Sequence, residues 1–120
     1  MKKLLACALA VLSLAACAGN RDDAEADKIT RAVINNDMTP VMNDLDPAIK
    51  GQITRVRVAE LSDELNAQGT YQGLTRDASW CRTGYICYDV KFSKHAYHEV
   101  MKVGSDGKVQ YWWIRPAQAK

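Results

Sequence analysis

The sequence lacks an apolar run long enough to cross a membrane. A spanning helix needs roughly 20 consecutive apolar residues, whereas the apolar run of this chain, from Leu4 to Ala16, is far shorter and no stop-transfer pattern follows it. Lys2 and Lys3 precede the run, as the positively charged start of a leader does. The pattern argues against a spanning anchor and predicts a signal peptide over residues 1–16.

An excess of charge of one sign is also missing. The chain holds 16 basic and 14 acidic residues, and without Lys2 and Lys3 the two kinds are equal in number. The basic character of the whole sequence therefore owes much to the leader. A balanced charge gives no reason to expect a nucleic-acid partner.

Few residues could carry catalysis. The chain has two histidines, His95 and His98, and the zinc-protease pattern His-Glu-x-x-His does not occur. Residues 95 and 98 of an extended strand point to opposite faces, and no serine or cysteine has the recognisable partners of a nucleophile. We therefore expect neither an enzyme nor a cofactor or metal site. If a catalytic base exists in a pocket, His98 and Asp89 are the first residues to test.

What the sequence does have is a cysteine placed directly after small residues. The leader ends in Leu14-Ala15-Ala16-Cys17, which resembles the signal peptide and lipobox of a bacterial lipoprotein. The resemblance implies cleavage before Cys17 and acylation of that residue, and several acyl chains would hold the protein at a membrane. A plain secretory leader, cut without lipidation, is the alternative.

The residues after Cys17 extend this resemblance to an address. Ala18 and Gly19 follow, with no aspartate next to the cysteine, and in Gram-negative lipoproteins such a pattern goes with transport to the outer membrane. The resemblance thus implies a cell-envelope protein that faces the periplasm. Residues 17–25 are small or charged and predict a lipidated tether, and the folded domain is expected over residues 26–116.

The two remaining cysteines of the domain suit an oxidising compartment. Cys81 and Cys87 bracket a short segment that reads as a turn between extended stretches, and we expect a disulfide between them. A zinc site is the alternative, but a single cysteine pair without a companion pair or histidine cluster is a weak one.

Helical patterns occupy the first half of the domain. Ala26, Ile29 and Val33 recur at helical spacing before a stop at residues 35–37. Thr39-Pro40 and Asp46-Pro47 each look like an N-cap followed by proline, which predicts two short helical turns. Val58, Leu61 and Leu65, with Gly69 beyond them, predict a further helix.

Extended patterns occupy the second half. Apolar and polar residues alternate over 86–93, with further strands expected over 71–77 and 97–103. Gly104-Ser105-Asp106-Gly107 lies between residues 100–103 and 108–114, which predicts a closing hairpin. Helices followed by four antiparallel strands predict an α+β domain with the helices on one face of a curved sheet.

This order resembles small exported NTF2-like (cystatin-like) domains. The residues that carry the likeness are Leu45-Asp46-Pro47 before a further helix and the hairpin Val103-Gly104-Ser105-Asp106-Gly107-Lys108-Val109 followed by Trp113-Ile114-Arg115-Pro116. The resemblance covers residues 24–116 and implies a conical fold. That superfamily hosts enzymes, ligand binders and interaction modules, so the fold does not define an activity.

The last strand carries large apolar groups on both faces. Alternation places Val109, Tyr111 and Trp113 on one face and Trp112 and Ile114 on the other. We expect Trp112 and Ile114 to form an interaction surface for a protein partner or a second copy of the chain. The alternative is that Trp112 packs within its own domain.

Three functions of different classes fit these features. The leading hypothesis is a non-catalytic lipoprotein whose domain binds a protein or small ligand through its cone or sheet face. The second is an immunity or inhibitor lipoprotein that neutralises a toxin reaching the periplasm. The third is a small enzyme with its site in the cone.

Overall fold

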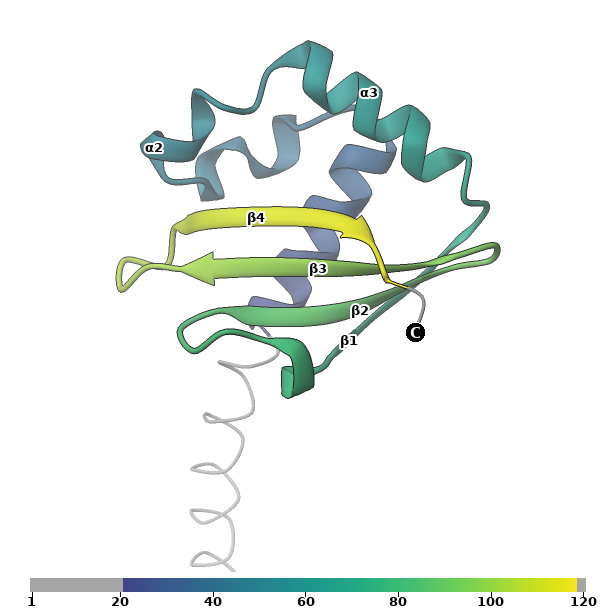
Figure 1. Ribbon diagram of the computed structural model, residues 1–120. Coiled ribbons are helices and arrows are strands. Elements are labelled where there is room, and N and C mark those ends of the chain that lie inside the picture. The colour runs from purple at the N-terminus through teal and green to yellow at the C-terminus, as the bar shows by residue number, and fades with distance from the viewer. Residues whose placement is uncertain (1–20, 119–120) are drawn as a thin grey trace, which may run out of the picture.

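The computed structural model describes residues 21–118, which form a layer of helices packed against one antiparallel sheet (Figure 1). The predicted α+β fold class is confirmed. Whether the fold is NTF2-like stays a prediction. No helix within residues 21–118 is long and apolar enough to span a membrane. The predicted signal peptide and the predicted lipidation site, Cys17, lie outside the described residues.

The helical half contains one long N-terminal helix and several shorter elements. The N-terminal helix is described over residues 21–34, followed by the 3-10 helix η1, Thr39–Asp44, the short helix α2, Pro47–Lys50, and helix α3, Arg55–Asn66. As predicted, the Asp46 side chain caps α2 by accepting a hydrogen bond from the backbone N–H of Ala48. The prediction of Thr39 as an N-cap is wrong: Thr39 is the first residue of η1, and Met38 is its N-cap.

The sheet is a meander in which each strand pairs with the next. Its strands are β1, Tyr71–Arg76, β2, Ile86–Phe92, β3, Ala96–Val103, and β4, Val109–Pro116, with a 3-10 turn η2, Ala78–Trp80, between β1 and β2. Gly107 has a φ of 82° in the hairpin between β3 and β4, a conformation that glycine adopts without strain. The four strands and the closing hairpin follow the sequence prediction closely.

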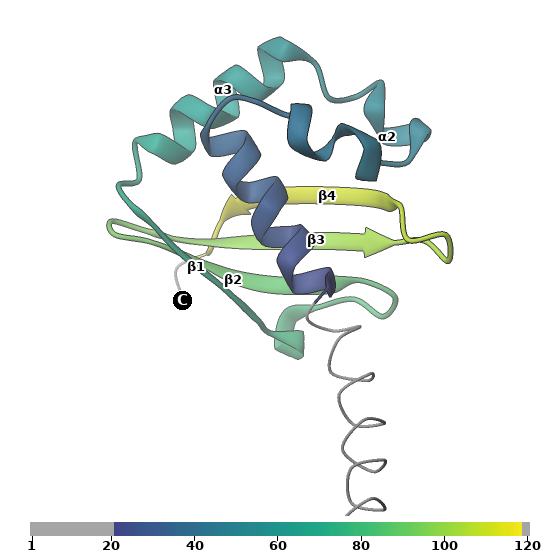
Figure 2. The ribbon, with the colours of Figure 1, turned by 180° about the vertical axis from the view of Figure 1, so that it is seen from behind.

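The two faces of the sheet differ in what covers them. The N-terminal helix lies across one face, the inner face, while α2 and α3 lie along the β4 side (Figure 2). Inner-face side chains build the core with residues of the helices; they include Tyr88, Val90, Tyr97, Met101 and Ile114. The opposite, outer face carries no α-helix within residues 21–118 (Figures 1 and 2), and the 3-10 turn η2 reaches it through Trp80.

The N-terminal helix begins earlier than the predicted domain boundary. Residues 21–25, assigned from the sequence to a tether, are helical, and Asp23 is bonded to the sheet. Its Oδ1 accepts hydrogen bonds from the Tyr88 hydroxyl at 2.9 Å and from Arg76 Nε at 2.5 Å. These bonds make residue 23 part of the folded domain, so any tether ends before it.

Candidate functional site

Asp89 and His98 lie together, but not in the interior. They face each other across β2 and β3, with 3.6 Å between His98 Nε2 and Asp89 Oδ1. The Trp80 ring stacks on the His98 ring with 4.1 Å between centroids, and Trp80 Nε1 donates to Asp89 Oδ1 at 3.1 Å. All three side chains lie on the outer face of the sheet. The two residues named as the first candidates for a catalytic base thus lie on the face of the sheet away from the core.

The electrostatics of this pair are those of a surface cluster. Partial burial under its neighbours raises the pKa of Asp89, and the nearby Asp77 carboxylate acts in the same direction. The side chain of Asp89 nevertheless remains 48% exposed, so water screens its charge. We assign the cluster a packing role in the η2 loop.

Trp112 and Ile114 point to the inner face, contrary to the surface predicted for them. Ile114 is only 3% exposed and Trp112 packs on the core. The cause is a bulge in β4. Tyr111 pairs with Lys102 and Val109 with Val103, so Gln110 is an extra residue. The extra residue lets Val109, Trp112 and Ile114 all face the inner side. The exposed aromatic residues of β4 are instead Tyr111 and Trp113, at 44% and 50% exposure.

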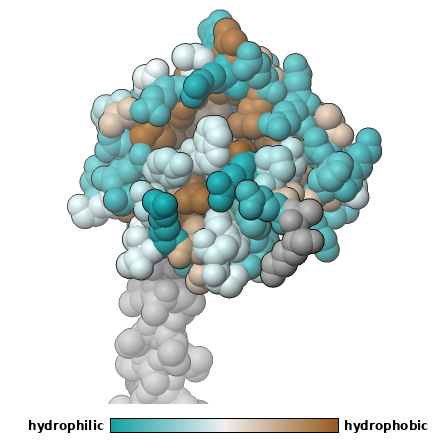
Figure 3. All heavy atoms as spheres, in the orientation of Figure 1, coloured by the Kyte–Doolittle hydropathy of each residue, from teal (hydrophilic) through white to brown (hydrophobic). Residues whose placement is uncertain are grey.

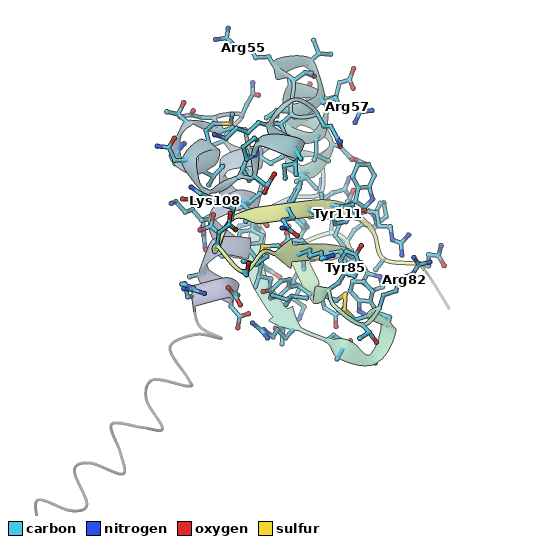
Figure 4. All side chains as sticks on the ribbon, turned by 90° about the vertical axis from the view of Figure 1, so that its left-hand side faces the viewer. Arg55, Arg57, Arg82, Tyr85, Lys108 and Tyr111 are labelled. Carbon is cyan, nitrogen blue, oxygen red and sulfur yellow. A yellow bond between two sulfur atoms is a disulfide. The ribbon has the colours of Figure 1, made fainter. Side chains whose placement is uncertain are left out.

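Tyr111 and Trp113 belong to an aromatic patch on the outer face. Trp113 lies opposite Val100 of β3, and Tyr111 lies opposite Lys102. The rings of Tyr85 and Tyr111 meet edge to face at 5.7 Å, and Lys102 Nζ lies 5.5 Å above the Tyr85 ring. Figure 4 shows Tyr85 and Tyr111 close together with Arg82 beside them. We call Trp80, Tyr85, Val100, Tyr111 and Trp113 the outer aromatic patch.

Cations surround the outer aromatic patch. Lys91, Lys102 and Arg115 extend from the outer positions of the strands, and Arg82 lies in the loop before β2. None of these four forms an ion pair with another residue in the part of the chain that the structure describes. By contrast, Arg31 and Arg76 near the N-terminal helix are held by Asp27 and Asp23. Asp89 and the nearby Asp77 lie beside Trp80 and offset part of this charge, so the rim of the patch keeps a net positive charge.

The predicted disulfide fixes one border of this patch. Cys81 and Cys87 are bonded, with Cα atoms 5.6 Å apart, which confirms the pairing. Cys87 lies opposite Val100 on the outer face, and the closed loop contains Tyr85. The bridge thus holds Tyr85 near Tyr111 and limits the conformational freedom that docking would otherwise remove.

The interior holds a carboxyl group that sequence reasoning did not select. Glu99 of β3 is fully buried, and its Oε1 contacts the hydroxyl of Thr30 on the N-terminal helix. Its other oxygen, Oε2, and the indole Nε1 of Trp112 are both buried and form no hydrogen bond of regular geometry among the described residues, although the indole lies close enough to act on the carboxyl group. Alternation with Tyr97 and Met101, both apolar and in the same predicted strand, was a signal that could have placed Glu99 inside.

The contacts of Thr30 indicate that Glu99 is protonated. Burial raises the pKa of Glu99 to about 8, although the Thr30 hydroxyl and the Trp112 indole act in the opposite direction. The Thr30 oxygen also contacts the Ala26 carbonyl at 2.9 Å, and a hydroxyl has one proton for these two contacts. A neutral Glu99 satisfies both, because its O–H donates to Thr30, which donates to Ala26.

No family model, no curated protein and no solved structure matches the chain. Within residues 21–118, no three histidine, cysteine, aspartate or glutamate side chains come together as ligands for a metal ion.

Proposed function

We propose that the protein is a lipoprotein of the bacterial cell envelope, anchored through Cys17, whose NTF2-like domain is a non-catalytic interaction module. Its location, by resemblance of the leader and of residues 18 and 19, is the outer membrane on the periplasmic side. The observation that carries the proposed activity is the outer aromatic patch with its positive rim. The partner is a second protein of the envelope with an acidic docking surface.

The composition of the patch suits protein recognition. Tryptophan, tyrosine and arginine are the residues that most often dominate binding energy in interfaces. Tyr111 and Trp113 expose about half of their surface, and Trp113 lies beside the apolar Val100. Burying such aromatic surface supplies affinity, since apolar burial contributes about 25 cal/mol per Å² before the costs of association.

The rim indicates the charge of the partner. Arg82, Lys91, Lys102 and Arg115 lie around the patch without ion pairs among the described residues. An acidic surface would meet these cations and accelerate its own encounter with the domain. Such an association weakens as salt concentration rises.

Affinity capture from envelope extracts tests this function. The full lipidated protein is compared with Trp113→Ala, Lys102→Glu and the control Val56→Ala, which removes an apolar side chain that is 67% exposed on α3, away from the patch. We expect one acidic protein to be retained by the wild type and by Val56→Ala, and to be lost from both patch variants and at high salt. Equal retention by all four forms contradicts the proposal.

Self-association is the competing outcome. Sedimentation of the wild type and Trp113→Ala in the same detergent distinguishes it. A wild-type dimer that Trp113→Ala dissociates would assign the patch to a second copy of the chain and overturn the proposal of an acidic partner.

A further inference from the structure

An apolar cavity of about 360 Å³ lies between the helices and the β4 edge of the sheet. Its walls come from each layer of the fold. They include Ile29 and Val33 of the N-terminal helix, Ile53 in the segment before α3, Leu61 of α3 and Trp112 of β4. In Figure 3, apolar residues gather around a hollow between the sheet and the helices above it. The cavity therefore opens to the surface and reaches the core.

The chemistry of the walls is almost uniform. Arg57 of α3 is the single charged residue among the described residues that line the cavity, and the polar groups Gln52, Gln110 and Tyr111 accompany it. Arg57 is exposed and forms no ion pair within residues 21–118. One unpaired cation thus stands beside an apolar space.

We infer that this cavity binds a single-chain amphiphile, with its alkyl chain between α3 and β4 and its anionic head at Arg57. The volume lies within the range of pockets that hold small ligands, which are mostly apolar with a few polar groups that fix orientation. Water molecules are poorly stabilised in such an apolar space, because a buried water needs two to four polar hydrogen-bond partners. A neutral apolar molecule would leave Arg57 unused, so charge complementarity selects the anion.

Ligand binding in the cavity does not require a partner on the outer aromatic patch, but the cavity and the patch share two residues. Tyr111 and Trp113 border the cavity as well as the outer face. An alkyl chain in the cavity would lie against the far side of the residues that a partner protein contacts. The anionic head has two possible sources, a free fatty acid or a monoacyl phospholipid, which share a single chain and one negative head group.

Photolabelling of the full chain in phosphatidylcholine vesicles tests the inference. The probes are alkyl chains with a terminal diazirine that end in a carboxylate, a phosphate ester or a neutral alcohol, and mass spectrometry locates the labelled residues. We expect labels on the cavity residues Met38, Ile53 and Leu61 from an anionic probe. A carboxylate or a phosphate that labels these residues supports the inference and identifies the source of the head group.

Matched variants separate the cavity from the membrane. Arg57→Gln should lower cavity labelling by the anionic probe about tenfold, as the loss of one charge-assisted hydrogen bond does. Arg55→Gln, on the same helix but pointing away from the body of the molecule in Figure 4, should leave it unchanged. Ala48→Phe adds a ring at an exposed position that borders the cavity and should reduce labelling without unfolding the domain.

Three results would overturn the inference. The first is labelling confined to residues outside the cavity, which reports only the membrane. The second is equal labelling of Met38, Ile53 and Leu61 by the alcohol and the anions. The third is unchanged labelling in Arg57→Gln and in Ala48→Phe while circular dichroism shows both variants folded.

Discussion

The Glu99 carboxyl group meets the Thr30 hydroxyl across the interface between β3 and the N-terminal helix. Both residues are fully buried. A buried carboxyl group is costly when charged and much less so when neutral and hydrogen-bonded. The contact therefore ties helix and sheet together in a way that depends on one proton.

The stability of the fold should fall as pH rises through the window set by Glu99. Burial raises its pKa from 4.5 to about 8 in the folded state, so between these values the folded chain holds a proton that the unfolded chain has released. The free energy of unfolding then decreases with pH, by up to about 1.4 kcal/mol per pH unit. Below pH 4.5 the contribution is fully present, and above pH 8 it is lost.

Glu99→Gln isolates this contribution. Glutamine keeps a donor toward Thr30 and has no proton to release, so we expect a flatter dependence of the unfolding free energy on pH, measured by urea titration at steps from pH 5 to 9. Glu25, whose pKa is raised to about 7 by burial and then by Asp44, acts in the same direction in both proteins. The difference between the two curves therefore reports Glu99 alone. Parallel curves would mean that Glu99 is ionised in the folded protein.

Asp23 should matter for stability although the sequence places it in a tether. Asp23→Ala removes the hydrogen-bond acceptor of the buried Tyr88 hydroxyl and one partner of Arg76. We expect a loss of about 1–3 kcal/mol in the free energy of unfolding, the usual cost of a buried polar group left unpaired. Asp63→Ala, an exposed aspartate of α3 without a side-chain bond among the described residues, serves as the control. Equal free energies of unfolding for the two variants would mean that Asp23 does not stabilise the folded domain and belongs to the tether.

Local signals in the sequence were sufficient for most of the fold. Gly107 and the Asp46-Pro47 pair influence only the few residues around them. The β3–β4 hairpin and α2 form at the positions that these residues predict. The helix over residues 55–66 likewise follows from its apolar spacing and its end before Gly69. Such signals depend mainly on neighbouring residues, and the one that failed, Thr39-Pro40, misplaced a cap by one residue.

The candidate site was harder to predict because it depends on which face each strand buries. Strict alternation put Val109 with Tyr111 and Trp113, and a single bulge at Gln110 reversed the assignment for the remainder of β4. The catalytic interest of His98 and Asp89 came from their side-chain chemistry. Glu99, one position along from His98, has the opposite orientation and was the buried acid. The unpaired state of the outer cations follows only from where the acidic residues lie in space.

Adjacent tryptophans of β4 should respond in opposite ways to truncation. Trp112 packs on the core, so Trp112→Ala should lower the free energy of unfolding by about 3 kcal/mol, at the low end of the range for a large aromatic residue. Trp113 lies on the outer face and is 50% exposed, so Trp113→Ala should cost about 1 kcal/mol or less. Urea unfolding of both variants, followed by circular dichroism because tryptophan is the residue removed, gives the comparison. Since the side chains of consecutive strand residues point to opposite faces, a larger loss for Trp113→Ala than for Trp112→Ala would mean that the register of β4 is shifted by one residue and that Trp112 belongs to the outer face.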